Sequence, residues 1–588
     1  MPAHLRAPRL LVSLQGYRRS WLRADLVAGL TVWAVLVPEA LAYATIAGVP
    51  PVVGLYAAVA SLVLYAVVGS SRHLVVGPMS ATAALSAGIV GGIAGGGSAE
   101  YIALTAALAL VTGVVGVLAG LLRLGFIAAF ISEPVLKGFI VGLALTIIVG
   151  QLPALFGVEK EPGNVFEQAT GLVGHLGDTN VPTLGVGLVA LALLVVLRRV
   201  LPLVPGALVA VLLGVLAVAL FGLDARGVEV VGSIEPGLPA LGLPGGLGPN
   251  DYLALVGASL GVLLVGFAEG LGAAKTYAAK AGYAIDPDRE LLGLGTANLG
   301  AGLSSGMVVN GSLSKTAVNG SAGARSQISG LTVAVLTVVT LLFLTGLFEQ
   351  LPEAVLAAVV IVAVVELVDI AALRALYAVW TARLGSIYGA AARADFAAAV
   401  ATLLGVLVFE TLPGLFIGIA MSLLLLLYRA SRPHVAVLGQ APSATRTWVD
   451  LARHPEAVQT PGVVVARVEG GLFFANADHV RDRIQALRVE HDAHAVVLDA
   501  QTMPFVDVTA AAMLRQLDAD LEGAGVRLAL ARDVGQVRDV LARTGGPNVA
   551  YRTLDEAVAA MAGDGREPGG QPVSPGEADP SPPGTPPR

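Results

Sequence analysis

Two short polar phrases, one in each half of the chain, carry the residue types of an anion site. GPMSATAALS at residues 77–86 and GSLSKTAVNG at 311–320 place Gly, Ser, Thr and Ala at the same offsets. A helix that starts at such a phrase presents free backbone N–H groups and about half a positive charge at its amino terminus. Two such helix starts facing each other could hold a small anion largely by backbone groups. Close packing of small residues between helices is the alternative explanation, but it needs fewer matched positions.

The second phrase carries a lysine, Lys315, where the first phrase has Ala81. A cation deep in a membrane is costly unless it serves an ion or a partner. Lys315 therefore either supplies positive charge to the bound anion, or it reaches the membrane surface or pairs with a nearby acid.

Two acidic residues precede the phrases at similar distances. Glu39 lies 38 positions before Gly77, and Glu269 lies 42 positions before Gly311. A carboxylate within a membrane span indicates a functional site and could carry a coupling ion. The structural alternative for Glu39 is a bond to backbone that Pro38 leaves unpaired. For Glu269 the alternative is an ion pair with Lys275 or Lys315.

The composition places these residues in a membrane protein. Of the 588 residues, 55% are hydrophobic and only 13% are charged, whereas a soluble protein carries about 25% charged residues. The chain has no cysteine, which excludes disulfides, thiolate metal sites and thiol catalysis. The sequence shows no metal-ligand spacing, phosphate loop or nucleophile–base pair. We therefore expect no enzyme activity, cofactor, metal site or nucleic-acid partner.

Residues 25–430 are expected to form the transmembrane domain. Fourteen apolar segments recur there, several of them short or interrupted by Gly and Pro. They lie near 25–46, 51–70, 77–95, 101–122, 125–157, 181–198, 203–222, 251–280, 288–305, 312–322, 326–347, 352–369, 394–410 and 413–429. Seven spans per half is an odd number, so two like halves would insert with opposite orientations, as in an inverted-repeat transporter.

Basic residues indicate which side of the membrane is cytoplasmic. The segment 1–24 is basic and lacks a cleavable pattern, so it is expected to be a cytoplasmic amino-terminal segment. Lys and Arg residues recur at the ends of the even-numbered spans, as the positive-inside rule requires. They are Arg72, Arg123, Arg198, Arg199, Lys280, Arg325, Arg374, Arg383, Arg429 and Arg432. Both termini are therefore predicted to be cytoplasmic.

The carboxyl-terminal part has a different pattern. Residues 434–562 alternate short apolar strands with amphipathic helices, which predicts a small cytoplasmic α/β domain. Residues 563–588 are rich in Pro, Gly and acidic residues and are expected to be disordered.

Several motifs resemble one known family. RADLVAGLTVWAVLVPEALAYATIAGVPPVVGLYAA, LLGLGTANLGAGLSSG and GSLSKTAVNGSAGARSQISGL resemble three membrane signatures of the SulP-type anion permeases. RVEGGLFFANADHVRDRI and LDAQTMPFVDVTAAAMLRQL resemble the STAS domain of that family, which is named for sulfate transporters and anti-sigma antagonists. The resemblance extends from about residue 20 to residue 562, with the motifs in the family's order.

The resemblance implies a fold, an assembly and a site. It implies an α-helical polytopic membrane protein with fourteen spans as a 7+7 inverted repeat, divided into core and gate domains and followed by the STAS domain. It also implies a homodimer and an elevator-like motion of the core against the gate. The anion-site residues that it implies are Met79, Ser80, Ala81, Thr82, Ser314, Lys315 and Thr316.

This chain departs from the family pattern at three positions. Many relatives have Gln where this chain has Glu39, and the acidic form resembles members that couple anion uptake to protons. Sodium-coupled bicarbonate relatives have Asp near the position of Glu269, which leaves sodium a possible coupling ion. In the STAS motif Asp507 is followed by Val508 rather than by a phosphorylated Ser, so we expect Thr509 to cap the following helix.

Taken together, the sequence predicts a secondary active anion transporter of the plasma membrane, embedded in the lipid bilayer. Proton-coupled sulfate uptake by an elevator mechanism is the leading hypothesis, with the anion between the amino termini of spans 3 and 10. The alternatives are a bicarbonate or C4-dicarboxylate symporter, coupled to protons or sodium, and an anion channel gated by the STAS domain. A sensing module, in which the STAS domain recruits a cytoplasmic partner, is a further possibility.

Overall fold

The computed structural model describes residues 10–94, 98–126, 132–161, 163–201, 204–232, 234, 236–365, 368, 370–378, 394–409, 411–442, 447–545 and 550–563. The predicted disordered tail, 563–588, lies outside these residues except for Gly563, as do residues 1–9 of the amino-terminal segment. The chain forms two compact units. The first contains the described residues up to 378 and those between 395 and 422, and the second contains Ala394 and the described residues from Leu423 onwards.

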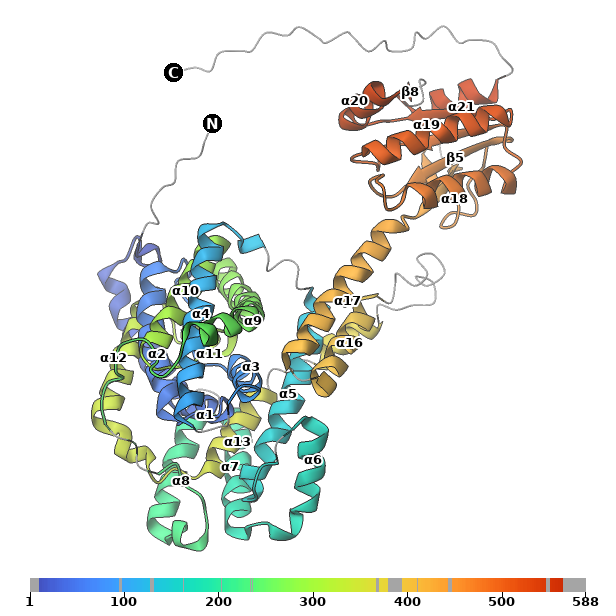
Figure 1. The fold of residues 1–588 in the computed structure, drawn as a ribbon. Coiled ribbons are helices and arrows are strands. Elements are labelled where there is room, and N and C mark those ends of the chain that lie inside the picture. Colours follow the sequence, from blue (N-terminus) through green and yellow to red (C-terminus); the bar gives the residue numbers. More distant parts are fainter. Residues whose placement is uncertain are drawn as a thin grey trace, which may run out of the picture. The chain divides into compact units, whose positions relative to one another are not determined.

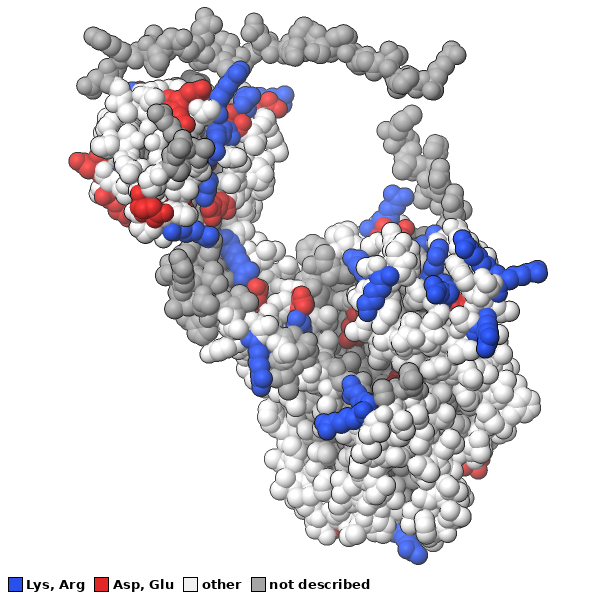
Figure 2. Space-filling model, turned by 180° about the vertical axis from the view of Figure 1, so that it is seen from behind, with Lys and Arg blue, Asp and Glu red and all other residues white. Residues whose placement is uncertain are grey.

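The first unit is helical, and a helix lies in each of the fourteen predicted apolar segments (Figure 1). These helices are α1 (Leu22–Ile46), α2 (Val52–Val68), α3 (Ser80–Gly91), α4 (Ala99–Leu121), α5 (Glu133–Phe156), α7 (Val181–Val200), α8 (Gly206–Phe221), α9 (Pro249–Ala281), α10 (Pro287–Leu303), α11 (Leu313–Ser321), α12 (Ile328–Val339), α13 (Glu353–Val365), α16 (Ala394–Phe409) and α17 (Thr411–Ser431), the last of which continues into the second unit. Seven helices among the described residues are long and apolar enough to cross a membrane, and the others are shorter. The visible face of this unit is mostly uncharged, with Lys and Arg gathered towards one end (Figure 2).

Several smaller elements were not predicted. Helix α6 (Val165–Gly174) begins with a capping box between Asn164 and Glu167, and α14 (Ile370–Ala378) follows α13. A π-helical turn, Thr340–Leu344, and a 3-10 turn, Thr345–Phe348, extend α12. Further 3-10 turns are Val12–Leu14, Arg19–Trp21, Leu176–Asp178 and Asp224–Arg226.

Two short strands bring the matched phrases together. Strand β1 (Val75–Gly77) precedes α3, and β2 (Asn310–Ser312) precedes α11. The strands pair in antiparallel register with Val76 opposite Gly311, and both are fully buried. A Cβ atom at Gly311 would lie 2.8 Å from the Cα atom of Gly270 on α9, so this position needs a residue without a side chain. Strand pairing thus brings together two phrases that are 234 residues apart in the sequence.

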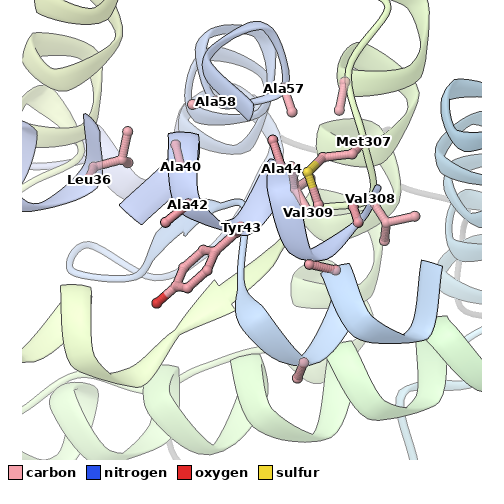
Figure 3. Packing of buried hydrophobic residues seen from close by; sticks show 14 of the residues in the cluster. Leu36, Ala40, Ala42, Tyr43, Ala44, Ala57, Ala58, Met307, Val308 and Val309 are labelled. Carbon is pink, nitrogen blue, oxygen red and sulfur yellow. The ribbon is translucent and has the colours of Figure 1, made fainter. Parts of the chain in front are cut away.

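Helices of the two halves pack on each other in matching pairs. Helix α1 packs against α12 and α11, while α9 packs against α4 and α3. Helix α2 packs against α12 and α10, and α10 packs against α4. Small side chains allow the close approach of α1 and α2 around the chain before β2 (Figure 3). The residues labelled in Figure 3 are Leu36, Ala40, Ala42, Tyr43, Ala44, Ala57, Ala58, Met307, Val308 and Val309.

Buried carboxylates fix the loops next to the paired strands. The Glu290 carboxylate of α10 accepts hydrogen bonds from the Ser70 hydroxyl and backbone N–H (2.6 and 2.8 Å), from the Ser71 N–H (3.0 Å) and from the Tyr65 hydroxyl (2.7 Å). Asp25 of α1 accepts from the backbone N–H groups of Arg325 and Ser326 at 2.6 and 3.1 Å. One loop precedes β1 and the other follows α11, so both carboxylates brace the same region.

The second unit contains a mixed sheet of order β4-β3-β5-β6-β7-β8. Strands β5 (Val463–Val468), β6 (Ala495–Asp499), β7 (Arg527–Ala531) and β8 (Ala550–Tyr551) are parallel, and β3 (Val435–Gln440) runs antiparallel to both β5 and β4 (Trp448–Asp450). The helices are α18 (Ala477–Glu490), α19 (Val508–Gly523), α20 (Gly535–Thr544) and α21 (Leu554–Ala562). The predicted alternation of β5, β6 and β7 with helices is present, whereas β3, β4 and β8 were not predicted.

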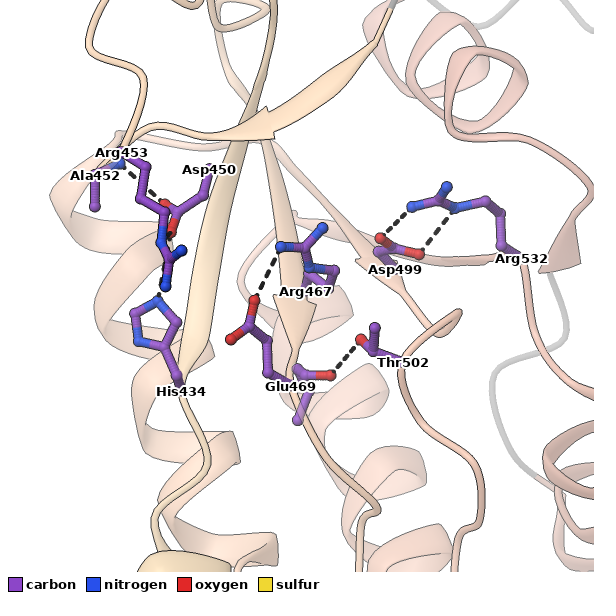
Figure 4. A network of polar contacts seen from close by, with 10 residues as sticks. His434, Asp450, Ala452, Arg453, Arg467, Glu469, Asp499, Thr502 and Arg532 are labelled. Atoms are coloured by element: carbon purple, nitrogen blue, oxygen red, sulfur yellow. Dashed lines mark hydrogen bonds and ion pairs between the residues drawn. The ribbon is translucent and has the colours of Figure 1, made fainter. Parts of the chain in front are cut away.

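Polar side chains link the strands of this sheet (Figure 4). Asp499 at the end of β6 is fully buried and pairs with Arg532, which follows β7. On β5, Arg467 pairs with Glu469 at 2.9 Å. The Asp499–Arg532 pair joins the ends of the neighbouring strands β6 and β7, whereas the Arg467–Glu469 pair lies along a single strand.

The hydrogen bonds that the Glu290 carboxylate accepts, which we call the Glu290 latch, can be tested for their contribution to stability. Glu290→Ala should lower the free energy of unfolding by about 3 kcal/mol, because it leaves several buried donors without an acceptor. Glu290→Gln keeps one acceptor and should cost less. Denaturant unfolding of the purified protein in detergent measures both changes. The control is Glu159→Ala at an exposed loop position, which should change stability by no more than about 0.5 kcal/mol. Equal effects at residues 290 and 159 would contradict the latch.

Candidate anion-binding site

Both matched phrases change from strand to helix, so that two helix amino termini lie beside the paired strands. Met79 is the extended residue before α3, and its side chain makes no capping hydrogen bond. Ser312 has the same role before α11, and its hydroxyl accepts a hydrogen bond from the Lys315 backbone N–H at 3.2 Å. The first turns of both helices therefore begin at the β1–β2 pair. Helix starts of this kind are the local structure that an anion site would use.

A buried ion pair joins α11 to α1 at this point. The Lys315 Nζ atom lies 2.7 Å from Oε2 of Glu39, and the two side chains are 1% and 10% exposed. Nζ also donates to the backbone carbonyl of Pro78 at 3.2 Å and lies 5.0 Å from the centre of the Tyr43 ring. Lys315 therefore contacts α1 and the start of the first phrase together. Of the alternatives open for Lys315, the structure contains the pair with an acid, and that acid is Glu39.

The other predicted anion-site residues have different surroundings. Met79, Ser80, Ala81 and Thr82 are all buried at the start of α3, with exposed fractions of 8% or less. The Thr82 hydroxyl donates to the carbonyl of Met79 at 3.2 Å. These residues lie in the same small region as the Lys315–Glu39 pair, because Pro78 contacts Lys315 directly.

Two residues of the second phrase point away from the ion pair. The Thr316 hydroxyl is fully buried and accepts a hydrogen bond from the Val75 N–H at 3.1 Å, so it holds β1 against α11. Ser314 is exposed, and its hydroxyl lies 3.1 Å from that of Ser312. Side chains of adjacent helical residues point in different directions, which separates Ser314, Lys315 and Thr316.

Glu269 occupies a separate position on α9. Its carboxylate accepts a hydrogen bond from the Asn310 side chain of β2 at 3.3 Å. Within the described part of the chain, neither of the ion pairs considered as alternatives for Glu269, with Lys275 or with Lys315, is formed. Glu269 thus lies beside the paired strands but not in the Lys315–Glu39 pair.

Three residues of this region were not predicted from the sequence. Tyr43 lies four residues after Glu39 on α1, a spacing that places both side chains on one helix face. Asn310 and Ser312 are the polar residues of β2 that flank Gly311. The helical spacing of Tyr43 was a readable signal, whereas the contacts of Asn310 depend on strand pairing that no local pattern reveals.

In the STAS motif the helix cap is Asp507, so the expected cap at Thr509 is wrong. The Asp507 carboxylate accepts hydrogen bonds from the N–H of Ala510 at 2.8 Å and from that of Phe474 at 2.9 Å. Helix α19 begins at Val508, so Thr509 lies within its first turn and is exposed. Asp507 takes the cap because its carboxylate reaches the N–H three residues ahead.

Comparison with known families assigns both parts of the chain. The model of the sulfate permease family matches residues 22–388, and the STAS domain model matches residues 454–557. A probable sulfate transporter of Mycobacterium tuberculosis is 37% identical over 559 residues, which cover 94% of this chain and 97% of that protein. The chloroplastic sulfate transporter 4.1 of Arabidopsis thaliana is 31% identical, over 90% of this chain and 78% of the relative.

Solved structures show the same fold. Murine solute carrier 26 family member A9, an anion transporter in the inward-facing state, superimposes with a TM-score of 0.83 at 23% identity. The match covers 94% of each chain. The transmembrane domain of a cyanobacterial bicarbonate transporter matches 69% of this chain with a TM-score of 0.57 at 21% identity. The chain is therefore a multi-pass helical membrane protein with a carboxyl-terminal STAS domain, and it belongs to the sulfate permease family.

Proposed function

We propose that this protein is a secondary active transporter of the plasma membrane that takes up sulfate together with protons. The observation that carries the proposal is the buried Lys315–Glu39 pair between the starts of α3 and α11. The amino termini of α3 and α11 and the Lys315 side chain form a positive region. The Glu39 carboxylate neutralises part of this charge. No metal or organic cofactor is needed for this chemistry.

The site favours an anion for two reasons. The first turns of α3 and α11 direct backbone N–H groups and positive helix ends towards the β1–β2 region. Lys315 adds a full charge that is almost completely buried. We propose that the bound anion is held by the starts of the two helices around Met79, Ser80 and Lys315.

Glu39 would link anion binding to protons. With Glu39 ionised, the Lys315 charge is balanced and an incoming anion must compete with the carboxylate. Protonation of Glu39 removes that negative charge and leaves a buried cation that is costly without a partner. The anion then becomes the partner of Lys315. By linkage, the anion must promote proton binding as much as the proton promotes anion binding.

Sulfate is favoured by the names of the relatives. The proteins with 37% and 31% identity are a probable sulfate transporter and a sulfate transporter. A divalent anion also gains more than a monovalent anion from a site that binds protons with the substrate. Bicarbonate and C4-dicarboxylates are the competing substrates to include in an assay.

The transport motion is part of the same proposal. We propose fourteen spans in an inverted repeat, with α1–α4 and α9–α12 as the core and the remaining spans as the gate. Helix α1 contacts α11 and α12, and its counterpart α9 contacts α3 and α4. This symmetry of the contacts between the two halves supports the repeat. Contacts of α13 with α5 and α7 support a separate gate. The core would move as an elevator in a homodimer with both termini in the cytoplasm.

Replacing Glu39 tests the coupling. In Glu39→Gln the side chain stays neutral at every pH, so Lys315 remains available to the anion. Sulfate uptake into proteoliposomes should lose its response to an inward proton gradient, and sulfate binding should no longer weaken as pH rises. Saturating uptake by the unmodified protein would also argue against a STAS-gated channel, whose flux would not saturate.

Glu269→Gln is the matched control, because it changes the other carboxylate beside β1 and β2. This variant should keep the response to the proton gradient. If Glu39→Gln responds fully and Glu269→Gln does not, Glu269 is the proton carrier instead. If a sodium gradient drives uptake by the unmodified protein and by Glu39→Gln but not by Glu269→Gln, the Glu269 carboxylate is the sodium-coupling residue.

Replacing Lys315 tests the anion site. Lys315→Gln in a Glu39→Gln background removes the cation without leaving an unpaired carboxylate. Its sulfate affinity, measured by isothermal titration calorimetry, should fall about a hundredfold or more relative to Glu39→Gln alone. The control is Lys280→Gln at the exposed end of α9, which should bind normally. Unchanged affinity in the double variant would place the anion elsewhere.

A further inference from the structure

An exposed apolar patch lies at one edge of the STAS sheet. We define it by Phe474, Phe505 and Val508, which are 71%, 40% and 73% exposed. Phe474 precedes α18, Phe505 lies three residues before α19, and Val508 is the first residue of α19. Phe473, half-buried beneath them, lies 5.6 Å from Phe474 and 6.2 Å from Phe505 between ring centres. Three aromatic rings therefore form one cluster that is open to the surroundings.

Backbone hydrogen bonds hold the patch in a fixed shape. The Leu472 N–H donates to the Phe505 carbonyl, and the Asp507 N–H donates to the Leu472 carbonyl, both at 3.1 Å. The Asp507 carboxylate, besides capping α19, accepts from the Phe474 N–H at 2.9 Å. The two loops that carry the patch are thus joined, and the exposed rings are presented by a rigid support.

The patch lies at the edge of the sheet where the chain arrives from α17. Strand β3 runs antiparallel to β5, with Val435 opposite Val468, so the start of β3 lies at the carboxyl end of β5. The side chain of Asn476, two residues after Phe474, donates to the carbonyl of Ala430 in the last turn of α17 at 3.0 Å. The patch and the end of α17 are therefore neighbours within the second unit.

The length and composition of α17 are those of a membrane span, which would bring this edge near lipid. Its 21 residues give a length of about 31 Å, which equals the hydrocarbon thickness of a bilayer. Arg429 lies in its last turn and Arg432 just beyond it, as expected at a cytoplasmic membrane surface. Only three residues separate Ser431 from Val435, and they span at most about 11 Å.

We infer that the patch of Phe474, Phe505 and Val508 rests in the lipid–water interface of the bilayer that α17 crosses. Apolar side chains gain free energy by entering this boundary, and basic residues beside them are attracted to anionic headgroups. Asp478, the exposed acid in the first turn of α18, pairs with Arg481 at 3.1 Å. The contact would hold the STAS domain against the membrane independently of the anion site.

The absence of cysteine in this chain allows single labels to test the contact. Phe474→Cys and Val508→Cys, each carrying a nitroxide spin label, are prepared in the full-length protein in nanodiscs of phosphatidylglycerol and phosphatidylcholine. Val489→Cys is the matched control, because Val489 is 68% exposed but lies at the other end of α18. Relaxation by oxygen, which enriches in lipid, is compared with relaxation by a water-soluble nickel chelate.

At residues 474 and 508 we expect oxygen to relax the label several-fold more effectively than the nickel chelate, with the opposite order at residue 489. The inference would be overturned if the nickel chelate relaxed the labels at all three sites as effectively as it relaxes a label exposed to water. Low access to both agents would also overturn it and would indicate a protein partner. Dipolar broadening between labels would identify that partner as a second copy of this chain.

Discussion

The ion pair between Lys315 and Glu39 is the interaction around which the membrane unit is arranged. Its two side chains come from α11 and α1 and are almost fully buried. Buried pairs contribute little net stability, because the cost of removing two charges from water offsets their attraction. An ionisable pair kept at this depth is therefore better explained by function than by folding. In the proposed mechanism, Glu39 exchanges Lys315 for a proton, and Lys315 exchanges Glu39 for the anion.

The surrounding structure holds the helices that carry both partners in place. Pairing of β1 with β2 aligns the starts of α3 and α11, and the Thr316–Val75 hydrogen bond locks α11 to β1. Asp25 and Glu290 brace the adjoining loops through backbone donors. The carboxylates of Asp25 and Glu290 already accept hydrogen bonds from the groups around them. Glu39 differs from them, since its partner is a lysine, which we propose also binds the anion.

Much of this arrangement could be predicted from sequence, because it depends on local patterns. Apolar segments identified the positions of the helices, and the matched phrases indicated that residues 77 and 311 belong to related elements. The partner of Lys315 could not be chosen, since Glu39 and Glu269 have equivalent positions in the two halves. The packing of α1 against α11 and of α9 against β2 brings Glu39 to the lysine and Asn310 to Glu269. Likewise, Thr509 and Asp507 were both chemically able to cap α19, and the backbone geometry selects Asp507.

The central proposal is that a proton on Glu39 and an anion at Lys315 bind together. The direct test is the pH change when sulfate is added to the purified protein in weakly buffered detergent solution. The unmodified protein should take up protons as sulfate binds, and the Glu39→Gln variant should bind sulfate without proton uptake. Sulfate binding by the unmodified protein with no proton uptake, or equal uptake by the variant, would contradict the account.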